Sequence, residues 1–266
     1  MAERLPDKVG VQPELRRFFT QLGSVGIPVG TPVNAEQAET GIAEEVFNLM
    51  DDGDRILFDG VTYTYDTTPT AADDEFDDAA TLAALIDAED RWNGTEVSDD
   101  LEIQAALGGI VFNDIPAHIH ILHDTTTGGG VSAPATASVS AAAIAELETG
   151  DVIGFAGEVF SYAETGADPT ENEFGNVTGL VALLDDLADW DAVVNTGAAD
   201  ITSSADGAEW NDFEIVILYT RTTAGGVDGT QGAPGAVCVD DSSIYVTWAG
   251  NTVNQANWRK VDHEAL

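Results

Sequence analysis

Apolar and polar positions recur in the same order twice along the chain, about 97 residues apart. Residues 53–65 read GDRILFDGVTYTY, and residues 150–162 read GDVIGFAGEVFSY. Each stretch has two runs of alternating apolar and polar residues around a short turn, Asp-Gly at 59–60 and Ala-Gly at 156–157. The pattern predicts a β-hairpin in each copy, with a type I′ turn at Asp-Gly and a weaker turn signal at Ala-Gly.

A helix is expected after each hairpin, beyond a polar and acidic loop. Residues 79–92 place leucine and isoleucine at helical spacing and end in Trp92, and residues 179–190 do the same and end in Trp190. We expect each helix to pack on a sheet, because a lone hairpin is only marginally stable. The tryptophan is expected to anchor the end of the helix.

Later strands complete each copy. Residues 115–122 and 213–219 are rich in apolar residues and predict strands that join the same sheet. The sequence therefore predicts an α+β fold of two tandem, small, ββαββ-like sandwich domains, at residues 35–131 and 132–227. So many matches in one order indicate a tandem duplication.

The two flanking segments differ from the repeats. Residues 228–266 predict a C-terminal β-meander with strands at Val237–Val239, Ser243–Trp248 and Trp258–Val261. Residues 1–34 form an N-terminal arm, either a disordered or strand-like terminus or an anchor that docks on an acidic partner such as a copy of this chain. The residues expected to anchor the arm are Arg4, Lys8, Arg16, Arg17, Phe18 and Phe19.

Charge narrows the possible partners and the environment. The chain has 48 Asp and Glu against 9 Lys and Arg, a formal net charge of −39, and the acids are spread along it. Such a surface repels nucleic acid, anionic membranes and any highly charged cofactor that no cation bridges. Molar salt shortens the Debye length to about 3 Å and removes most of the self-repulsion. The sequence therefore predicts a halophilic source.

The C-terminal residues resemble a known class of proteins. The pattern G-x-P-G-A-x-x-V-D-D-x-x-I-Y-V-x-x-A-x-N, with an aromatic-basic finish at 258–260, is similar to the endings of many phage head- and tail-associated proteins. The G-D-x-I-x-F-x-G hairpin also resembles elements of tailed-virus virion proteins, whereas residues 252–256 depart from the shorter turn of the family. The pattern is carried here by Gly232, Pro234, Gly235, Ala236, Val239, Asp240, Asp241, Ile244, Tyr245, Val246, Ala249 and Asn251.

With the halophilic surface, the resemblance implies a non-enzymatic virion structural protein of a haloarchaeal tailed virus, assembled in the host cytoplasm. Its expected place is the capsid exterior, as a decoration or turret protein that contacts the major capsid protein. We expect a homo-oligomer, because closed symmetry lets one anchor serve several chains. A tail or baseplate component is the next choice. A halophilic cell-surface adhesin should carry a signal peptide, and residues 1–6 lack its apolar run.

Three histidines lie close together in the first copy. Alternation along a strand puts His118 and His120 on one face, where two imidazoles could hold zinc or nickel, particularly with Asp124 or a symmetry mate. The alternative is a solvated or interface strand face without a metal. The second copy, aligned by sequence, has other residues in place of His118, His120 and His123, namely Glu214, Val216 and Tyr219.

Other candidate chemistry is weak. Neighbouring carboxylates are unavoidable with 48 acidic residues, and no calcium-loop pattern occurs, so we expect no catalytic or cofactor-binding residues and at most weakly bound cations. Gly128–Gly130 lacks the residues of a phosphate loop and predicts a flexible turn. Cys238 is the only cysteine, which excludes an internal disulfide. No window approaches the roughly 18 apolar residues of a membrane span.

Overall fold

The computed structural model describes residues 35–226, 237–239, 244–247 and 258–261. Over these residues the fold is mixed α+β, mostly β-sheet with few helices, which confirms the α+β part of the predicted fold class. The N-terminal arm and its expected anchoring residues lie outside the described residues. The chain divides into two compact units, a main unit of residues 40–104 and 114–223 and a second unit of residues 1–39, 105–113 and 224–266.

The two repeats have the same order of elements, including short 3-10 turns at corresponding points. The first repeat consists of β1 (Glu39–Ile42), α2 (Glu44–Phe47), β2 (Arg55–Phe58), β3 (Val61–Tyr65), β4 (Glu75–Phe76), α3 (Ala79–Asp87), β5 (Trp92–Val97), β6 (Asp100–Ala105) and β7 (Pro116–Thr125). The second consists of β8 (Pro134–Val139), α4 (Ala141–Ala145), β9 (Val152–Phe155), β10 (Glu158–Tyr162), β11 (Glu173–Phe174), α5 (Val177–Asp185), β12 (Trp190–Asn195), β13 (Ala198–Asp206) and β14 (Glu214–Thr222).

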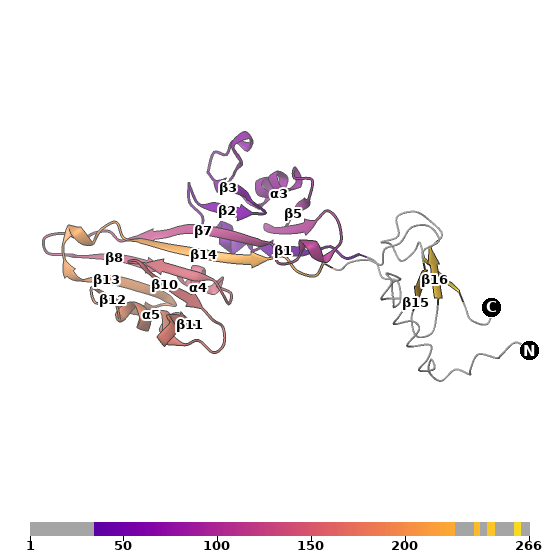
Figure 1. Ribbon diagram of the computed structural model, residues 1–266. Coiled ribbons are helices and arrows are strands. Elements are labelled where there is room, and N and C mark those ends of the chain that lie inside the picture. The colour runs from indigo at the N-terminus through magenta and orange to yellow at the C-terminus, as the bar shows by residue number, and fades with distance from the viewer. Residues whose placement is uncertain (1–34, 227–236, 240–243, 248–257, 262–266) are drawn as a thin grey trace, which may run out of the picture. The chain divides into compact units, whose positions relative to one another are not determined.

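One continuous eight-stranded sheet joins the repeats, in the order β4-β3-β2-β7-β14-β9-β10-β11. Strands β7 and β14, the last of each repeat, run antiparallel side by side at its centre (Figure 1). The order of strands read outward from this pair is the same on both sides, so the repeats are related by an approximate twofold axis. Most of both repeats belongs to the main unit, whereas residues 35–39, 105–113 and 224–226 belong to the second unit. The predicted boundary at 131/132 falls between β7 and β8.

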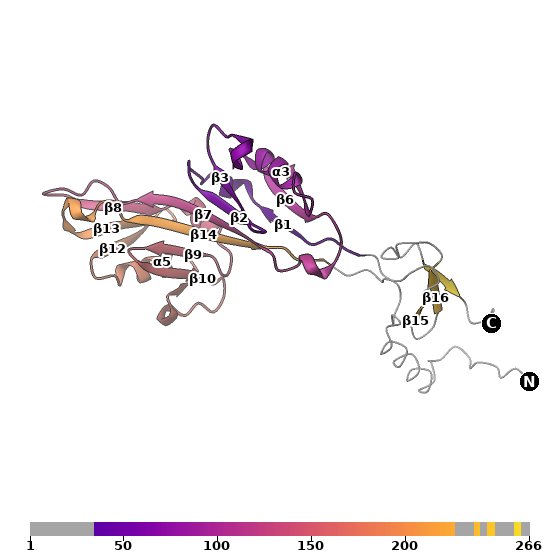
Figure 2. The ribbon, with the colours of Figure 1, turned by 45° about the horizontal axis from the view of Figure 1, so that its top comes forward.

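The core lies on one face of the large sheet. Two small sheets, in the orders β1-β6-β5 and β12-β13-β8, supply the opposing layer, one for each repeat (Figure 2). The ring of Trp92 packs edge-on against Phe58 with centroids 4.8 Å apart, and Trp190 packs against Phe155 at the same distance. The two tryptophans are 2% and 3% exposed. They therefore hold corresponding positions, as the duplication predicts.

The hairpin turns have the predicted geometry in both copies. Asp59 and Gly60 have φ of 46° and 86°, and Ala156 and Gly157 have φ of 51° and 84°. Positive φ at both central residues is the signature of a type I′ turn, so the second copy forms the same turn although its first residue is alanine. In the first copy the Asp59 carboxylate also accepts a hydrogen bond of 2.7 Å from the Trp92 indole.

The predicted helices exist but end sooner than expected. Asp78 caps α3 by accepting from the Thr81 backbone N–H at 2.7 Å, and the helix ends at Asp87 instead of continuing to Trp92. In the second repeat α5 ends at Asp185. The tryptophans therefore begin strands β5 and β12 instead of closing the helices, because their rings fill the space between the two sheet layers.

The small sheets were not predicted. In β6 the side chains of Leu101, Ile103 and Ala105 are buried and alternate with exposed residues, a half-buried strand pattern that the sequence contains. The turn before β6 has positive φ at Ser98 and Asp99, and neither of these residues is a glycine. The absence of glycine there made the β5–β6 hairpin hard to recognise.

The predicted C-terminal meander strands are confirmed in the second unit. Strands β15 (Val237–Val239), β16 (Ile244–Thr247) and β17 (Trp258–Val261) pair antiparallel in sequence order. Each lies within about one residue of its expected bounds, because alternating residues between turn signals determine short antiparallel strands locally.

Candidate functional site

The predicted histidine pair lies on β7, where burial alternates along the strand. His118 is half-buried and His120 exposed, whereas the residues beside and between them are buried, which confirms that the two histidines share a face. The Nδ1 atom of His118 lies 3.3 Å from the Thr220 hydroxyl. Among the described residues no three His, Cys, Asp or Glu side chains gather to hold a metal ion. The metal site therefore stays a prediction that needs ligands from another molecule.

The sheet register corrects the sequence alignment of the two copies. Sequence comparison put Glu214 and Val216 in the places of His118 and His120. The pairing of β2 with β7, compared with that of β9 with β14, makes Val216 and Leu218 their counterparts instead. A bulge in β7 that has no equivalent in β14 adds a residue to the first copy. This extra residue accounts for one position of the two-residue offset between the sequence match and the sheet register.

The bulge brings His123 into contact with the second repeat. Its Nε2 accepts a hydrogen bond of 2.9 Å from the backbone N–H of Ser140, the residue that caps α4. The neighbouring Asp124 accepts from the Ser138 N–H at 2.8 Å. Burial lowers the pKa of His123, with the nearby Asp124 carboxylate acting in the opposite direction. Tyr219, which sequence comparison put in place of His123, instead lies in the core and donates to the Ala143 carbonyl at 3.0 Å.

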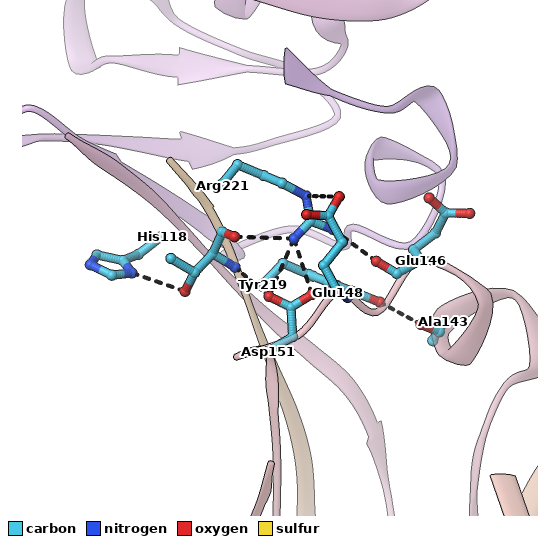
Figure 3. Close-up of polar contacts among 8 residues, drawn as sticks. His118, Ala143, Glu146, Glu148, Asp151, Tyr219 and Arg221 are labelled. Atoms are coloured by element: carbon cyan, nitrogen blue, oxygen red, sulfur yellow. Dashed lines mark hydrogen bonds and ion pairs between the residues drawn. The ribbon is translucent and has the colours of Figure 1, made fainter. Parts of the chain in front are cut away.

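A buried ion cluster joins Arg221, on the core face of β14, to Asp151, the residue before β9 (Figure 3). The Arg221 guanidinium donates to both oxygens of Asp151, at 3.0 and 3.2 Å, and to the Glu146 carbonyl at 2.8 Å. Its Nε lies 3.3 Å from the Glu148 carboxylate, and its Cζ lies 5.5 Å from the centre of the Tyr219 ring. Because Asp151 is 1% and Arg221 8% exposed, each neutralises a charge that would otherwise be buried alone.

The first repeat buries the corresponding carboxylate without an arginine. Asp54 accepts from the backbone N–H groups of Asp51 and Leu122, both at 2.8 Å, as Asp151 accepts from Glu148 and Thr220. Burial raises the pKa of Asp54, while the two N–H donors act in the opposite direction. The Gly-Asp pair that recurs before each hairpin was the sequence signal for these two buried carboxylates. That each aspartate accepts a hydrogen bond from the last strand of its repeat was not recognised from the sequence.

A second pair of recurring residues connects the repeats through their Gly-Gly turns. The Asn211 side chain accepts from the Gly129 N–H at 2.8 Å and donates to the Gly129 carbonyl at 3.2 Å. Within the second unit Asn113 makes the same two bonds with Gly226, at 2.8 and 2.9 Å. Each asparagine thus binds the turn that follows the last strand of the other repeat. The turn predicted to be flexible is held by side-chain hydrogen bonds.

The face of the large sheet opposite the core is uncovered within the main unit, and we call it the open face. Register places its residues in three rows across six strands, and none of them is buried. The rows are Thr62, Leu57, His118 and Thr220; Thr64, Arg55, His120, Leu218, Val152 and Ser161; and Leu122, Val216, Gly154 and Val159. None of the residues in these three rows carries a carboxylate, although the chain has 48 acidic residues. Glu214, exposed at the start of β14, lies on the same face beyond the third row.

Carboxylates gather elsewhere in the main unit. A hollow of about 490 Å³ is lined by residues of α2, α3 and the β5–β6 turn. Asp78 there caps α3, and Glu96 accepts from the Asp99 N–H at 2.8 Å. A carboxylate oxygen that already accepts a hydrogen bond from the backbone is less available to bind a cation. The weak cation binding expected from the sequence stays a prediction. The acidic members of the lining are Glu44, Asp77, Asp78, Glu96 and Asp99.

Comparison with family models, with curated proteins and with solved structures found no match to this chain. Within the described residues no helix is long and apolar enough to cross a membrane.

Proposed function

We propose that this chain is a non-enzymatic virion structural protein of a halophilic archaeal tailed virus, located on the capsid surface as a decoration or turret protein. It forms a homo-oligomer and contacts the major capsid protein. The N-terminal arm is its proposed anchor. The two copies are proposed to be tandem ββαββ-like sandwich domains that share their central sheet, with the C-terminal meander as a separate element.

The observation that carries the proposal is the distribution of acidic groups. Among the described residues the buried carboxylates are those of Asp54 and Asp151, and the others lie at least partly in solvent. A surface of this kind is stable where molar salt screens it, because the screening length falls to about 3 Å. The phage-like C-terminal pattern and the duplication support a place in a virion, and the halophilic surface supports an archaeal host.

The test is the position of the protein on virus particles. Antibodies against residues 40–223 should label the capsid surface of particles purified from the culture that makes this chain, as seen by immunogold electron microscopy. Antibodies first absorbed with the purified protein serve as the control and should give no label. Label confined to the tail or baseplate would overturn the capsid position. Label on the cell envelope with none on particles would overturn the virion assignment in favour of an adhesin.

A further inference from the structure

We propose that the open face of the eight-stranded sheet is the surface through which two copies of this chain associate, face to face. The inference takes the homo-oligomer from the proposed function and assigns its contact surface. It rests on the apolar character of this face, on its charge and on the charge of the rest of the chain.

Six aliphatic side chains lie on the open face, among threonine, histidine and other polar residues. Leu57, Leu122 and Val159 are 42%, 39% and 55% exposed, far more than aliphatic residues in a core. Val216 and Leu218 lie between them on β14 and are half-buried. Leu122, Val216, Leu218 and Val159 lie in neighbouring rows around Val152 and Gly154 and form one contiguous patch, whereas His118 and His120 separate Leu57 from it. A contiguous apolar patch on an acidic protein indicates an interaction surface.

The charge of the open face selects the partner. Arg55 is the one permanently charged residue in its three rows, so the face offers too little positive charge to bind an acidic macromolecule by charge alone. Carboxylates appear at the two ends of the central row, at Glu75 on β4 and Glu173 on β11. Each accepts a hydrogen bond from a backbone N–H of its own loop, at 2.9 and 3.0 Å. Glu214 adds a further carboxylate at the start of β14, beyond the third row. The carboxylates therefore lie at the rim of the face and not in its three rows, as in protein interfaces with a charged rim.

A second copy of the chain meets this face at the lowest electrostatic cost. With a net charge of −39, two copies that approach through carboxylate-bearing surfaces bring like charges together. Approach through two open faces brings together aliphatic, threonine and histidine side chains with a single arginine on each side, while the carboxylates stay at the edges of the face. Two sheets that pack in this way form a sandwich with an interlayer distance of about 10 Å. The interface is isologous, so it closes at two copies.

The experiment measures self-association of the full chain by sedimentation equilibrium in about 2 M KCl, where long-range repulsion is screened. Leu57→Asp and Leu122→Asp each put a carboxylate on the open face. Val193→Asp is the matched control, because Val193 is 60% exposed on β12, outside the open face. We expect each open-face variant to raise the dimer dissociation constant at least about tenfold and the control to leave it unchanged. Unchanged melting temperatures show that the variants fold.

A wild-type chain that stays monomeric up to about 100 µM overturns the inference. A dimer that resists both open-face substitutions, or that weakens equally with Val193→Asp, overturns it as well. Deletion of residues 1–34 tests whether the N-terminal arm of the same chain covers the open face in place of a second copy. If the dimer forms only after this deletion, the face is covered by the chain's own arm and the inference fails. These outcomes concern the purified protein and do not depend on whether antibodies find it on particles.

Discussion

Gly129, in the turn between β7 and β8, lies where the second repeat leaves no room for a side chain. A Cβ atom there would lie 2.3 Å from the Gly207 carbonyl oxygen, 2.9 Å from Asn211 Oδ1 and 3.1 Å from the Ala135 Cβ. Because the nearest of these atoms belongs to the backbone, alanine at this position forces the turn to move. The two hydrogen bonds between Gly129 and Asn211 are then lost or lengthened.

The size of the effect follows from these contacts. Inserting a methyl group into a well-packed site costs about 1–3 kcal/mol. Each hydrogen bond of the turn contributes about 0.5–1.5 kcal/mol. We therefore expect Gly129→Ala to lower the free energy of unfolding by about 2–4 kcal/mol, since the strain and the loss of hydrogen bonds share one movement and do not add fully.

Urea unfolding in about 2 M KCl, followed by circular dichroism, measures this difference at constant screening. Gly130→Ala is the control, because a Cβ atom on Gly130 meets nothing within 4 Å. The control should be neutral or stabilised by up to about 1 kcal/mol, since alanine also restricts the unfolded chain. Equal unfolding midpoints for the two glycine variants would refute the argument that Asn211 and the Gly207 backbone require glycine at position 129.

Three further predictions concern charge. The melting temperature of the wild type should rise between about 0.1 M and 1 M KCl, because screening relieves self-repulsion, and an unchanged value would contradict the halophilic interpretation. Arg221→Met should cost about 3–5 kcal/mol in urea unfolding by leaving Asp151 buried without its cation, and a neutral result would show that solvent reaches the carboxylate. His123 has a lowered pKa, so the stability that its neutral ring contributes is present above pH 6.5 and is lost as the pH falls below it. His123→Gln retains an acceptor for the Ser140 N–H. In melting curves at several pH values, this variant should therefore show a smaller fall in melting temperature below pH 6.5 than the wild type, whereas the exposed control His120→Gln should not.

Local sequence was sufficient to predict the elements whose geometry depends on near neighbours. The two hairpins, their positive-φ turns and the start of α3 are determined within a few residues, and the structure has them where the sequence indicates. The second helix, α5, begins at Val177, two residues before the expected position. Alternation along β7 also placed His118 and His120 on one face correctly. These features need only side-chain periodicity and turn chemistry.

Tertiary structure alone decided how the copies combine. The bulge that shifts β7 by one residue, the pairing of β7 with β14 and the contacts of Asn211 with Gly129 join residues far apart in sequence. No local pattern specifies such pairs, since each side chain is compatible with several partners until the chain is folded. The register then determines that the three rows of the open face carry no carboxylate, while Glu75, Glu173 and Glu214 lie at its edges. The sequence contains every residue of that face, but only the sheet brings them together, because neighbours across strands are set by long-range hydrogen bonds.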